Sequence, residues 1–179
     1  CVRDILREVE RLNLLIGRFL NLSSHKPEQW ASCSLGNLAR QVLNRKEPEL
    51  RKRGIQMVLK VAEGDDHIPT QADRLESALE NLIDNAIHAL ESRSQERKIE
   101  VQVIPFRKVV QLQVQDNGPG FSGDALRLAI QPFYSERTRG TGLGLAIVRR
   151  IVEDHRGTLQ LMNAKAGGAV VKMVFPKGK

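Results

Sequence analysis

Residues 1–24 carry apolar side chains at alternating spacings of three and four positions. Charged side chains occupy much of the sequence between them. This spacing is typical of an amphipathic helix whose apolar seam packs against another helix. The pattern therefore predicts one long helix that needs a partner, and a linker at about 25–33, where Lys26-Pro27 interrupts the seam. The seam residues are Val2, Ile5, Val9, Leu12, Ile16 and Phe19.

Helical and strand patterns alternate along the rest of the chain. Helices are predicted over about 35–53, 73–92, 124–130 and 142–155. Strands are predicted over about 55–61, 99–104, 109–114, 158–162 and 169–175. Strands with helices on one side favour an α+β fold, a two-layer α/β sandwich. We divide the chain into an N-terminal unit, 1–28, and one larger domain, 29–179.

Composition and charge narrow the functional classes. The chain of 179 residues is 41% hydrophobic but only 4% aromatic, so the core must consist of aliphatic side chains. The formal net charge is +7, yet basic residues alternate with acidic ones and lack aromatic stacking partners, which argues against a nucleic-acid partner. Cys1 and Cys33 form no CxxC pair, so a thiol-based metal site is not expected.

No apolar stretch reaches the roughly 18 to 20 residues that a bilayer requires, and no signal peptide is visible. We therefore expect a cytoplasmic chain. The sequence leaves open whether the parent protein is anchored in an inner membrane.

Three polar side chains follow one another along the predicted helix 73–92. Asn81, Asn85 and His88 stand at positions i, i+4 and i+7, on a different face from the apolar stripe. Two amide oxygens one turn apart can bind a hard cation that keeps water and phosphate oxygens at its other positions. A polar surface would give the same pattern, so this helix alone decides nothing. The apolar stripe consists of Leu75, Leu79, Leu82 and Ala86.

Two helix starts are also predicted. Asp73 and Glu76 have the spacing of a capping box, so we expect Asp73 to open the helix. Thr141 is the expected N-cap of the helix that begins near 142.

The segment 116–120, Asp-Asn-Gly-Pro-Gly, directly follows a predicted strand. A turn explains it, because Asn-Gly and Pro-Gly pairs are frequent in turns. A functional interpretation is that Asp116 accepts a hydrogen bond from the amino group of a planar base, which the glycines allow to approach the backbone.

The segment 140–145, Gly-Thr-Gly-Leu-Gly-Leu, leads into a predicted helix. Its glycines expose backbone N–H groups at a helix N-terminus, an arrangement that binds phosphate. It is not a Walker loop, because no Gly-Lys-Ser/Thr follows, and it does not directly follow a strand as a dinucleotide fingerprint does.

In this order the three motifs resemble the histidine-kinase branch of the ATPase superfamily shared with gyrase, Hsp90 and MutL. The resemblance covers about 30–179 and implies a Bergerat-type ATP-binding fold, a mixed sheet with helices on one face. Residues 1–24 are similar to the second helix of the dimerisation and phosphotransfer stem of these kinases. The matching motifs are the N box at 81–86, the G1 box at 116–120, the F box at 132–134 and the G2 box at 140–145.

The resemblance implies a role for each motif. Asp116 would bind the adenine amino group, Asn85 would be the Mg²⁺ ligand, and Asn81 would lie beside it near the phosphates. The phosphates would lie under a lid of about 122–139. Further nucleotide contacts are expected from His88, Gly118, Gly120, Phe133, Arg137, Gly140, Thr141, Gly142, Leu143 and Gly144.

Three positions depart from the family pattern. His88 stands where relatives often carry lysine, which would make the charge there depend on pH. Arg137 replaces a lysine of the lid and keeps its charge, so it is a candidate catalytic residue. Asn81 stands where the hydrolysing relatives place a catalytic glutamate. Because an amide cannot accept a proton from water, transfer to another acceptor is favoured, with Asn81 as a catalytic residue.

We therefore predict the catalytic fragment of a two-component sensor protein-histidine kinase that binds ATP and Mg²⁺. The γ-phosphate would pass to a histidine on a stem helix outside this chain and then to the receiver domain of a response regulator. The chain would form a homodimer through its N-terminal helix, and no phosphorylation in cis is expected. The histidines present lack the His-Glu or His-Asp setting of an acceptor: His25, His67, His88 and His155.

Two alternatives remain open at this point. The chain could be a non-catalytic module that binds ATP and dimerises, or an ATPase of the gyrase or Hsp90 kind.

Overall fold

The computed structural model describes residues 30–178, except 92, 94–95, 129–130, 132–133 and 135–141. The predicted helix 1–24 and the unit 1–28 lie outside these residues, so the domain boundary stays a prediction. Four expected site residues also lie outside them: Phe133, Arg137, Gly140 and Thr141.

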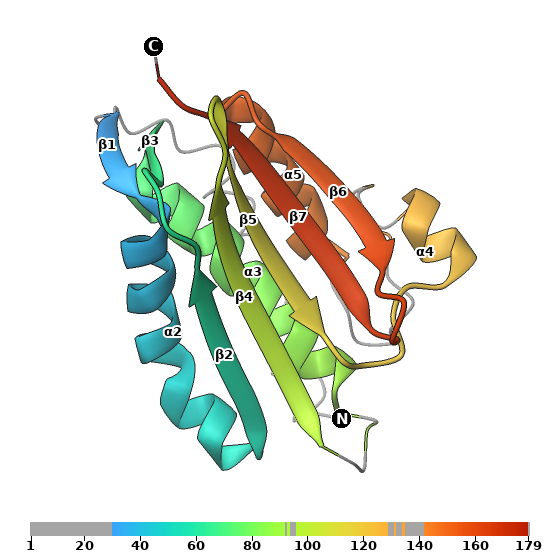
Figure 1. Ribbon diagram of the computed structural model, residues 1–179. Helices are drawn as coiled ribbons and strands as arrows, with labels where there is room; N and C mark the ends of the chain where they lie inside the picture. Colours follow the sequence, from blue (N-terminus) through green and yellow to red (C-terminus); the bar gives the residue numbers. More distant parts are fainter. Residues whose placement is uncertain are drawn as a thin grey trace, which may run out of the picture.

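A five-stranded mixed sheet forms one layer of the fold (Figure 1). The spatial order is β2-β4-β5-β7-β6, with β2 parallel to β4 and all other neighbours antiparallel. The mixed sheet expected from the resemblance is confirmed. The strands are β2 (Ile55–Val61), β4 (Arg97–Pro105), β5 (Val109–Asp116), β6 (Thr158–Asn163) and β7 (Ala169–Pro176).

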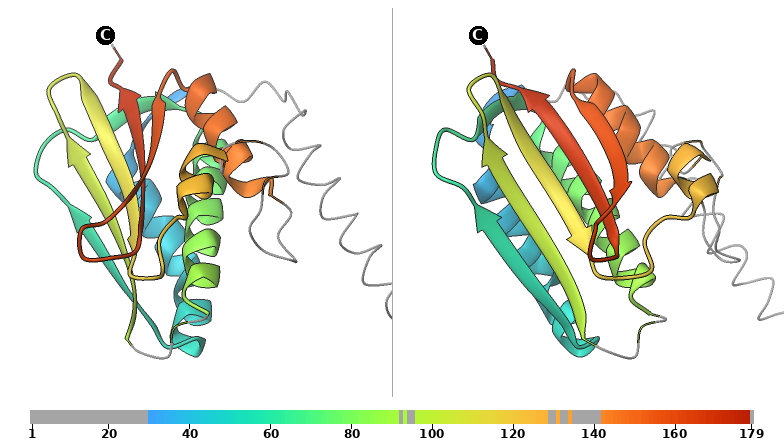
Figure 2. Two further views of the ribbon diagram at one scale, coloured as in Figure 1. Left: turned by 90° about the vertical axis from the view of Figure 1, so that its right-hand side faces the viewer. Right: turned by 45° about the vertical axis from the view of Figure 1, so that its right-hand side comes forward.

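Helices form the second layer, on one face of the sheet only (Figure 2). The sheet is covered by α2 (Leu35–Lys52), α3 (Ala72–Ala89) and α5 (Gly144–Asp154), while the short α4 (Gly123–Leu128) lies beside the end of the sheet. The two-layer sandwich is therefore confirmed. In the described ranges, no helix combines the length and the apolar character that crossing a bilayer requires.

The core between the layers is almost entirely aliphatic, as the composition requires. The predicted stripe of α3 is buried, with exposures of 0% for Leu75 and Leu79. Alternate residues of β4, among them Ile99 and Val101, face the same core and are fully buried. Burying each such side chain contributes about 1.5–3 kcal/mol, so the period of the apolar positions decides which face each element turns inward.

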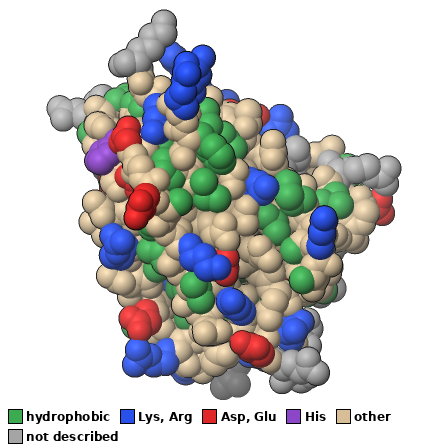
Figure 3. All heavy atoms as spheres, in the orientation of Figure 1, with side chains coloured by type: hydrophobic (Ala, Val, Ile, Leu, Met, Phe, Trp, Pro, Cys, Tyr) green, Lys and Arg blue, Asp and Glu red, His purple; other side chains and the backbone are tan. Residues whose placement is uncertain are grey.

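The opposite face of the sheet is not covered by helices, and it carries charged side chains among hydrophobic ones (Figure 3). Lysine and arginine side chains on this face are interspersed with acidic ones and form no single patch. On β4, for example, Glu100 lies 3.0 Å from Lys60 and 3.7 Å from Lys98.

A second, two-stranded sheet was not predicted. β1 (Ala31–Ser34) pairs antiparallel with β3 (His67–Thr70), in a region assigned in part to a linker. The buried carboxylate of Asp66 joins this sheet to α2, because it accepts hydrogen bonds from Ser34 Oγ at 2.9 Å and from Gly36 N at 2.7 Å. A long-range contact of one side chain thus stabilises strands too short and polar to give a periodic signal.

The predicted capping box at the start of α3 is wrong. Gln71, not Asp73, is the N-cap residue, and its side chain makes no capping bond. The backbone N–H of Gln71 instead donates to Nε2 of His155 at 3.1 Å, and Glu76 forms an ion pair with Arg45 of α2 at 2.6 Å. A residue far along the sequence satisfies this helix end, which local spacing cannot reveal.

His155 is buried and links α5 to α3 as a neutral ring. Its Nδ1 donates to the carbonyl oxygen of Ile151 at 2.7 Å, which leaves Nε2 to accept from Gln71 N and to pair with Thr70 Oγ1 at 2.8 Å. If Nε2 were protonated, its N–H would face the N–H of Gln71, and the hydrogen bond between them would be lost. Burial lowers the pKa of His155, the nearby Arg74 lowers it too, and the bond to Ile151 and the charge of Asp154 oppose that shift.

The neutral His155 should make stability depend on pH. Since its folded-state pKa lies below the ordinary value of 6.5, its contribution is complete above about pH 6.5 and is lost as pH falls through the folded-state pKa. We expect His155→Gln to lower the free energy of unfolding by about 1–3 kcal/mol at pH 8, and by progressively less toward pH 5. Urea unfolding of both proteins at four pH values measures this. A difference between them that stays constant with pH would contradict it.

Candidate nucleotide-binding site

The start of α5 lies directly opposite the two predicted amides of α3. A Cβ atom built on Gly144 would stand 3.5 Å from Asn81 Oδ1 and 3.5 Å from Asn85 Nδ2. Both amides are partly exposed and lie on the side of α3 that faces α5. The structure therefore brings Asn81 and Asn85 together with Gly144, the described part of the 140–145 motif that begins α5.

The amide of Asn81 has a defined orientation. Its Nδ2 donates to the carbonyl oxygen of Ser77, one turn earlier in α3, at 2.8 Å. Its carbonyl oxygen, Oδ1, lies 3.5 Å from the Cβ position of Gly144. An oxygen is thus turned toward the α5 start, where it could bind a cation or accept a hydrogen bond from a water molecule.

The N-terminus of α5 is suited to an anion. The helix begins at Gly144 with Leu143 as the N-cap residue, so the prediction that Thr141 is the N-cap is wrong. An apolar N-cap residue supplies no capping oxygen, and the N–H groups of a first helical turn attract negative charge. Gly142 has a φ of 65° where the chain turns into α5, a left-handed backbone conformation that glycine adopts without strain.

Asp116, the last residue of β5, is a buried carboxylate with 6% exposure. Its Oδ1 accepts hydrogen bonds from Gly118 N at 2.8 Å and from Ala169 N at 3.2 Å. These two bonds fix the carboxylate between the end of β5 and the start of β7. A buried carboxylate held in this way can accept a hydrogen bond from a ligand in one defined direction.

Glycines allow the backbone to close around Asp116. A Cβ atom on Gly118 would lie 2.9 Å from Asp116 Oδ1 and 3.3 Å from the carbonyl oxygen of Ala89 in α3. A Cβ atom on Gly168 would lie 2.0 Å from the carbonyl oxygen of Asp116, which leaves no room for any side chain. Gly168 was not among the predicted site residues, because it lies outside the three motifs, between the predicted strands 158–162 and 169–175.

His88 is exposed on α3. Its Nδ1 lies 2.5 Å from the carbonyl oxygen of Asp84 in the same helix. A role beside phosphates therefore stays a prediction. Glu80, in contrast, forms an ion pair with Arg45 of α2 at 3.0 Å, so it faces away from Gly144, as its helical position predicts.

The donor set near Gly144 fits magnesium accompanied by phosphate. The described residues contain no group of three or more histidine, cysteine or acidic side chains that could hold a metal by themselves. Mg²⁺ typically takes only one or two protein oxygens and completes its shell with water and phosphate oxygens. Asn85, with Asn81 one turn away, could supply such a ligand beside the anion-binding helix start.

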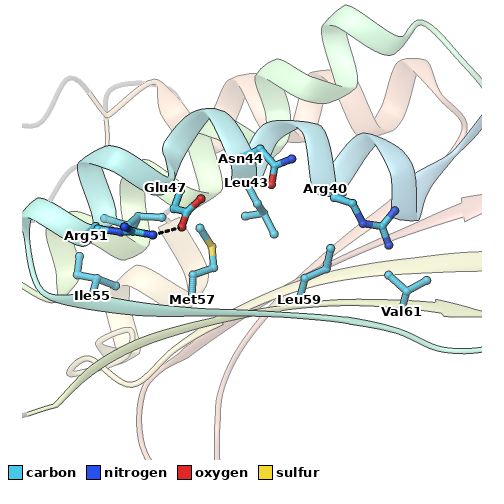
Figure 4. A pocket seen from close by; sticks show the side chains of 10 residues that line it. Arg40, Leu43, Asn44, Glu47, Arg51, Ile55, Met57, Leu59 and Val61 are labelled. Carbon is cyan, nitrogen blue, oxygen red and sulfur yellow. Dashed lines mark hydrogen bonds and ion pairs between the residues drawn. The ribbon is translucent and has the colours of Figure 1, made fainter.

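A separate groove of about 630 Å³ lies between α2 and the edge strand β2 (Figure 4). Arg40, Glu47 and Arg51 of α2 border it, and Met57 and Leu59 of β2 form its apolar wall. None of the predicted site residues that the structure describes lines it, and its elements are not those that meet at Gly144. The groove is therefore distinct from the candidate nucleotide site.

Comparison with known proteins identifies the family of this chain. Residues 70–179 match the family model described as histidine kinase-, DNA gyrase B-, and HSP90-like ATPase. The chain belongs to this ATPase family. The match begins at the end of β3, so β1, α2 and β2 precede the matched segment although they pack in the same fold.

Two of the curated relatives, ZraS and AtoS, are histidine kinases. ZraS of Salmonella typhimurium is 30% identical over 170 residues, which are 95% of this chain and 36% of ZraS. AtoS of Escherichia coli is 29% identical over 177 residues, which are 96% of this chain and 28% of AtoS. The chain thus spans only about a third of the length of these curated relatives.

Solved structures show the same fold. The catalytic domain of histidine kinase ThkA superposes with a TM-score of 0.75 at 29% identity, covering 83% of this chain and 96% of that domain. Full-length ShkA in complex with AMPPNP superposes with a TM-score of 0.80 at 25% identity, covering 97% of this chain and 38% of the ShkA chain. ThkA in complex with response regulator protein TrrA superposes with a TM-score of 0.80 at 26% identity, covering 97% of this chain and 49% of that chain. Within the ATPase family, the chain is therefore similar to histidine kinase catalytic domains.

Proposed function

We propose that this chain is the ATP-binding catalytic part of a sensor protein-histidine kinase. Two observations carry the proposal: two side-chain amides meet the helix start at Gly144, and β5 ends on a buried carboxylate. Similarity to ShkA, which binds AMPPNP, and to ThkA, which forms a complex with a response regulator, supports it.

Each part of the site would bind one part of ATP. Asp116 would accept a hydrogen bond from the adenine amino group, next to the backbone of Gly118 and Gly120. The N-terminus of α5, with Gly142 and Gly144, would bind the phosphates through backbone N–H groups. Mg²⁺, held through Asn85, would neutralise charge on the β- and γ-phosphates when bound.

The chemistry would be phosphoryl transfer by positioning. A nitrogen of the acceptor imidazole would bond to the γ-phosphorus as the bond to the β–γ bridging oxygen breaks, and ADP would leave. Water is a poor competitor, because Asn81 is an amide and Glu80 is engaged with Arg45 of α2. Arg137 of the lid would add positive charge at the transferred group.

The partners follow from the same proposal. The acceptor histidine would lie on a stem helix that pairs with the predicted helix at 1–24, in a homodimer. The receiver domain of a response regulator would then take the phosphoryl group. A cytoplasmic location belongs to this proposal, because the reaction consumes ATP.

The test supplies the acceptor separately. The chain is incubated with Mg²⁺ and ATP labelled at the γ-phosphate, together with the histidine-bearing stem fragment of the same parent protein. We expect an acid-labile, base-stable phosphohistidine on the fragment, absent when the acceptor histidine is replaced by glutamine. Nucleotide binding without transfer would favour a non-catalytic module, and steady release of phosphate without an acceptor would favour an ATPase.

A further inference from the structure

Arg93 connects the end of α3 to the loop that follows β5. Its backbone N–H donates to the carbonyl oxygen of Leu90, the C-cap residue of α3, at 3.0 Å. Its side chain donates from Nη1 to the carbonyl oxygen of Asn117 at 2.7 Å and from Nε to that of Glu96 at 2.9 Å. Arginine is suited to this, because its planar group presents several donors in a fixed geometry. One half-buried residue thus joins the helix to the loop.

The peptide unit between Asn117 and Gly118 takes part in hydrogen bonds at both ends. Its carbonyl oxygen accepts from the guanidinium of Arg93, and its N–H donates to Oδ1 of Asp116 at 2.8 Å. A cation, one peptide unit and a carboxylate therefore form a short chain of hydrogen bonds. Hydrogen bonds in such a chain polarise and strengthen one another, so the guanidinium makes this N–H a better donor to Asp116.

The loop is also anchored to β4, independently of Arg93. The side chain of Asn117 accepts from Lys98 N at 2.8 Å and donates to the carbonyl oxygen of Glu96 at 2.9 Å. Its backbone N–H donates to the carbonyl oxygen of Lys98 at 3.2 Å, which continues the pairing of β4 with β5 one residue beyond Asp116. These bonds remain when Arg93 is replaced, so its loss should affect one peptide unit and leave the loop folded.

We propose that Arg93 is a positioning residue for recognition of the base: through the peptide unit before Gly118, it sets the direction in which Asp116 presents its carboxylate. This inference rests on the proposed function, which assigns the adenine amino group to Asp116. Without Arg93 the carboxylate keeps its bond from Ala169 N at 3.2 Å, but its bond from Gly118 weakens and its direction is held less firmly. The loss should concern the amino group of the base and leave the phosphate contacts unchanged.

The experiment compares two nucleotides that differ at the recognised group. Isothermal titration in Mg²⁺ measures the affinities for ATP and for inosine triphosphate, which carries a carbonyl oxygen in place of the amino group. We expect Arg93→Ala to lower the affinity for ATP about tenfold, because a misdirected hydrogen bond is weak, and the affinity for inosine triphosphate less than about twofold. Arg93→Lys keeps the charge and can donate one bond, so its ATP affinity should fall between those of Arg93→Ala and the unaltered chain.

Arg107→Ala is the matched control. Arg107 is exposed in the turn that joins β4 to β5, at the other end of this hairpin from Asp116, and its replacement should change neither affinity. Equal losses of both affinities in Arg93→Ala would mean that Arg93 only supports the fold around the site, and would overturn the positioning role.

A double variant tests whether Arg93 acts through Asp116. If it does, Arg93→Ala should change the affinity for ATP less than about twofold when Asp116→Asn is already present, because the two effects share one interaction. A further tenfold loss in the double variant would show that Arg93 acts by another route, and would contradict the proposal.

A measurement without nucleotide follows the hydrogen bonds themselves. Hydrogen exchange at the Gly118 amide should accelerate in Arg93→Ala, while the amide of Phe106, which donates to the carbonyl oxygen of Val109 at the far end of the hairpin, keeps its rate. Unchanged exchange at Gly118 would overturn the positioning role alone. If the unaltered chain does not prefer ATP to inosine triphosphate, the assignment of the base to Asp116 in the proposed function fails first, and the positioning role fails with it.

Discussion

Replacing Asp116 by asparagine is expected to lower the affinity for ATP by about a hundredfold, with little change in the melting temperature. Asparagine keeps one acceptor oxygen for the N–H groups of Gly118 and Ala169, so the end of β5 should stay closed. Its other terminal atom becomes an NH₂ group, which would meet the adenine amino group donor against donor. A hydrogen bond to a charged partner is typically worth about 1.5–3 kcal/mol, and the mismatch adds to its loss.

Titration with a fluorescent ATP analogue in Mg²⁺ measures this affinity, and Asp65→Asn is a matched control. Asp65 is exposed beside His67, in the loop before β3, and should leave ATP binding unchanged. Inosine triphosphate, which lacks the amino group, supplies a further check, because only the unaltered chain should prefer ATP over it. Unchanged ATP affinity in Asp116→Asn would remove the basis for placing the base there.

Gly168→Ala should lower the free energy of unfolding by about 3–5 kcal/mol. Its φ of 94° disfavours any side chain, and a Cβ atom there would stand 2.0 Å from the carbonyl oxygen and 2.8 Å from the carbonyl carbon of Asp116. Those atoms belong to the backbone of Asp116 at the end of β5, where β5 pairs with β4 and β7, so they cannot move without disturbing these pairings.

The adjacent glycine gives an unusually close control. Gly167 has φ of 92°, but a Cβ atom there would meet nothing within 4 Å. Gly167→Ala carries the conformational strain without the clash and should cost about 1–2 kcal/mol. Urea unfolding monitored by circular dichroism compares the two variants. Equal destabilisation would mean that the contact with Asp116 contributes nothing.

Regular elements with a strong apolar period could be predicted from the sequence. The stripe of α3 through Leu75 and Leu79 and the alternation of β4 through Ile99 and Val101 depend only on which positions are apolar. Their burial follows directly, because the core excludes the polar positions between them. The helices and longer strands were therefore found within a few residues of their ends.

Elements that depend on distant partners could not be predicted. β1 and β3 are four residues each and need the buried carboxylate of Asp66 to join them to α2. The start of α3 depends on His155, which lies 84 positions after Gln71 in the sequence. The hydrogen bonds between the side chain of Asn163 and the backbone of Phe121 likewise join residues far apart in the sequence, and no local pattern predicts them.

The candidate site was predictable in its motifs but not in its geometry. The order of the three motifs identified the family, and Asn81, Asn85 and Asp116 were named from them. That the amides face the first residue of α5 follows from the packing of α3 against α5, which the sequence alone does not contain. The close packing of Gly168 against the backbone of Asp116 also could not be predicted, because it depends on how the turn between β6 and β7 folds against the end of β5.

The most direct test of a shared nucleotide and metal site is to replace Mg²⁺ by paramagnetic Mn²⁺ in the ATP complex and record the NMR signals of the protein. We predict selective broadening of the Asn85 side-chain amide and the Gly144 backbone amide. The amide of Gly64, beside Pro105 at the far end of the hairpin from Asp116, should be unaffected. Broadening along β2 in the groove, with the Asn85 signal unchanged, would contradict the account.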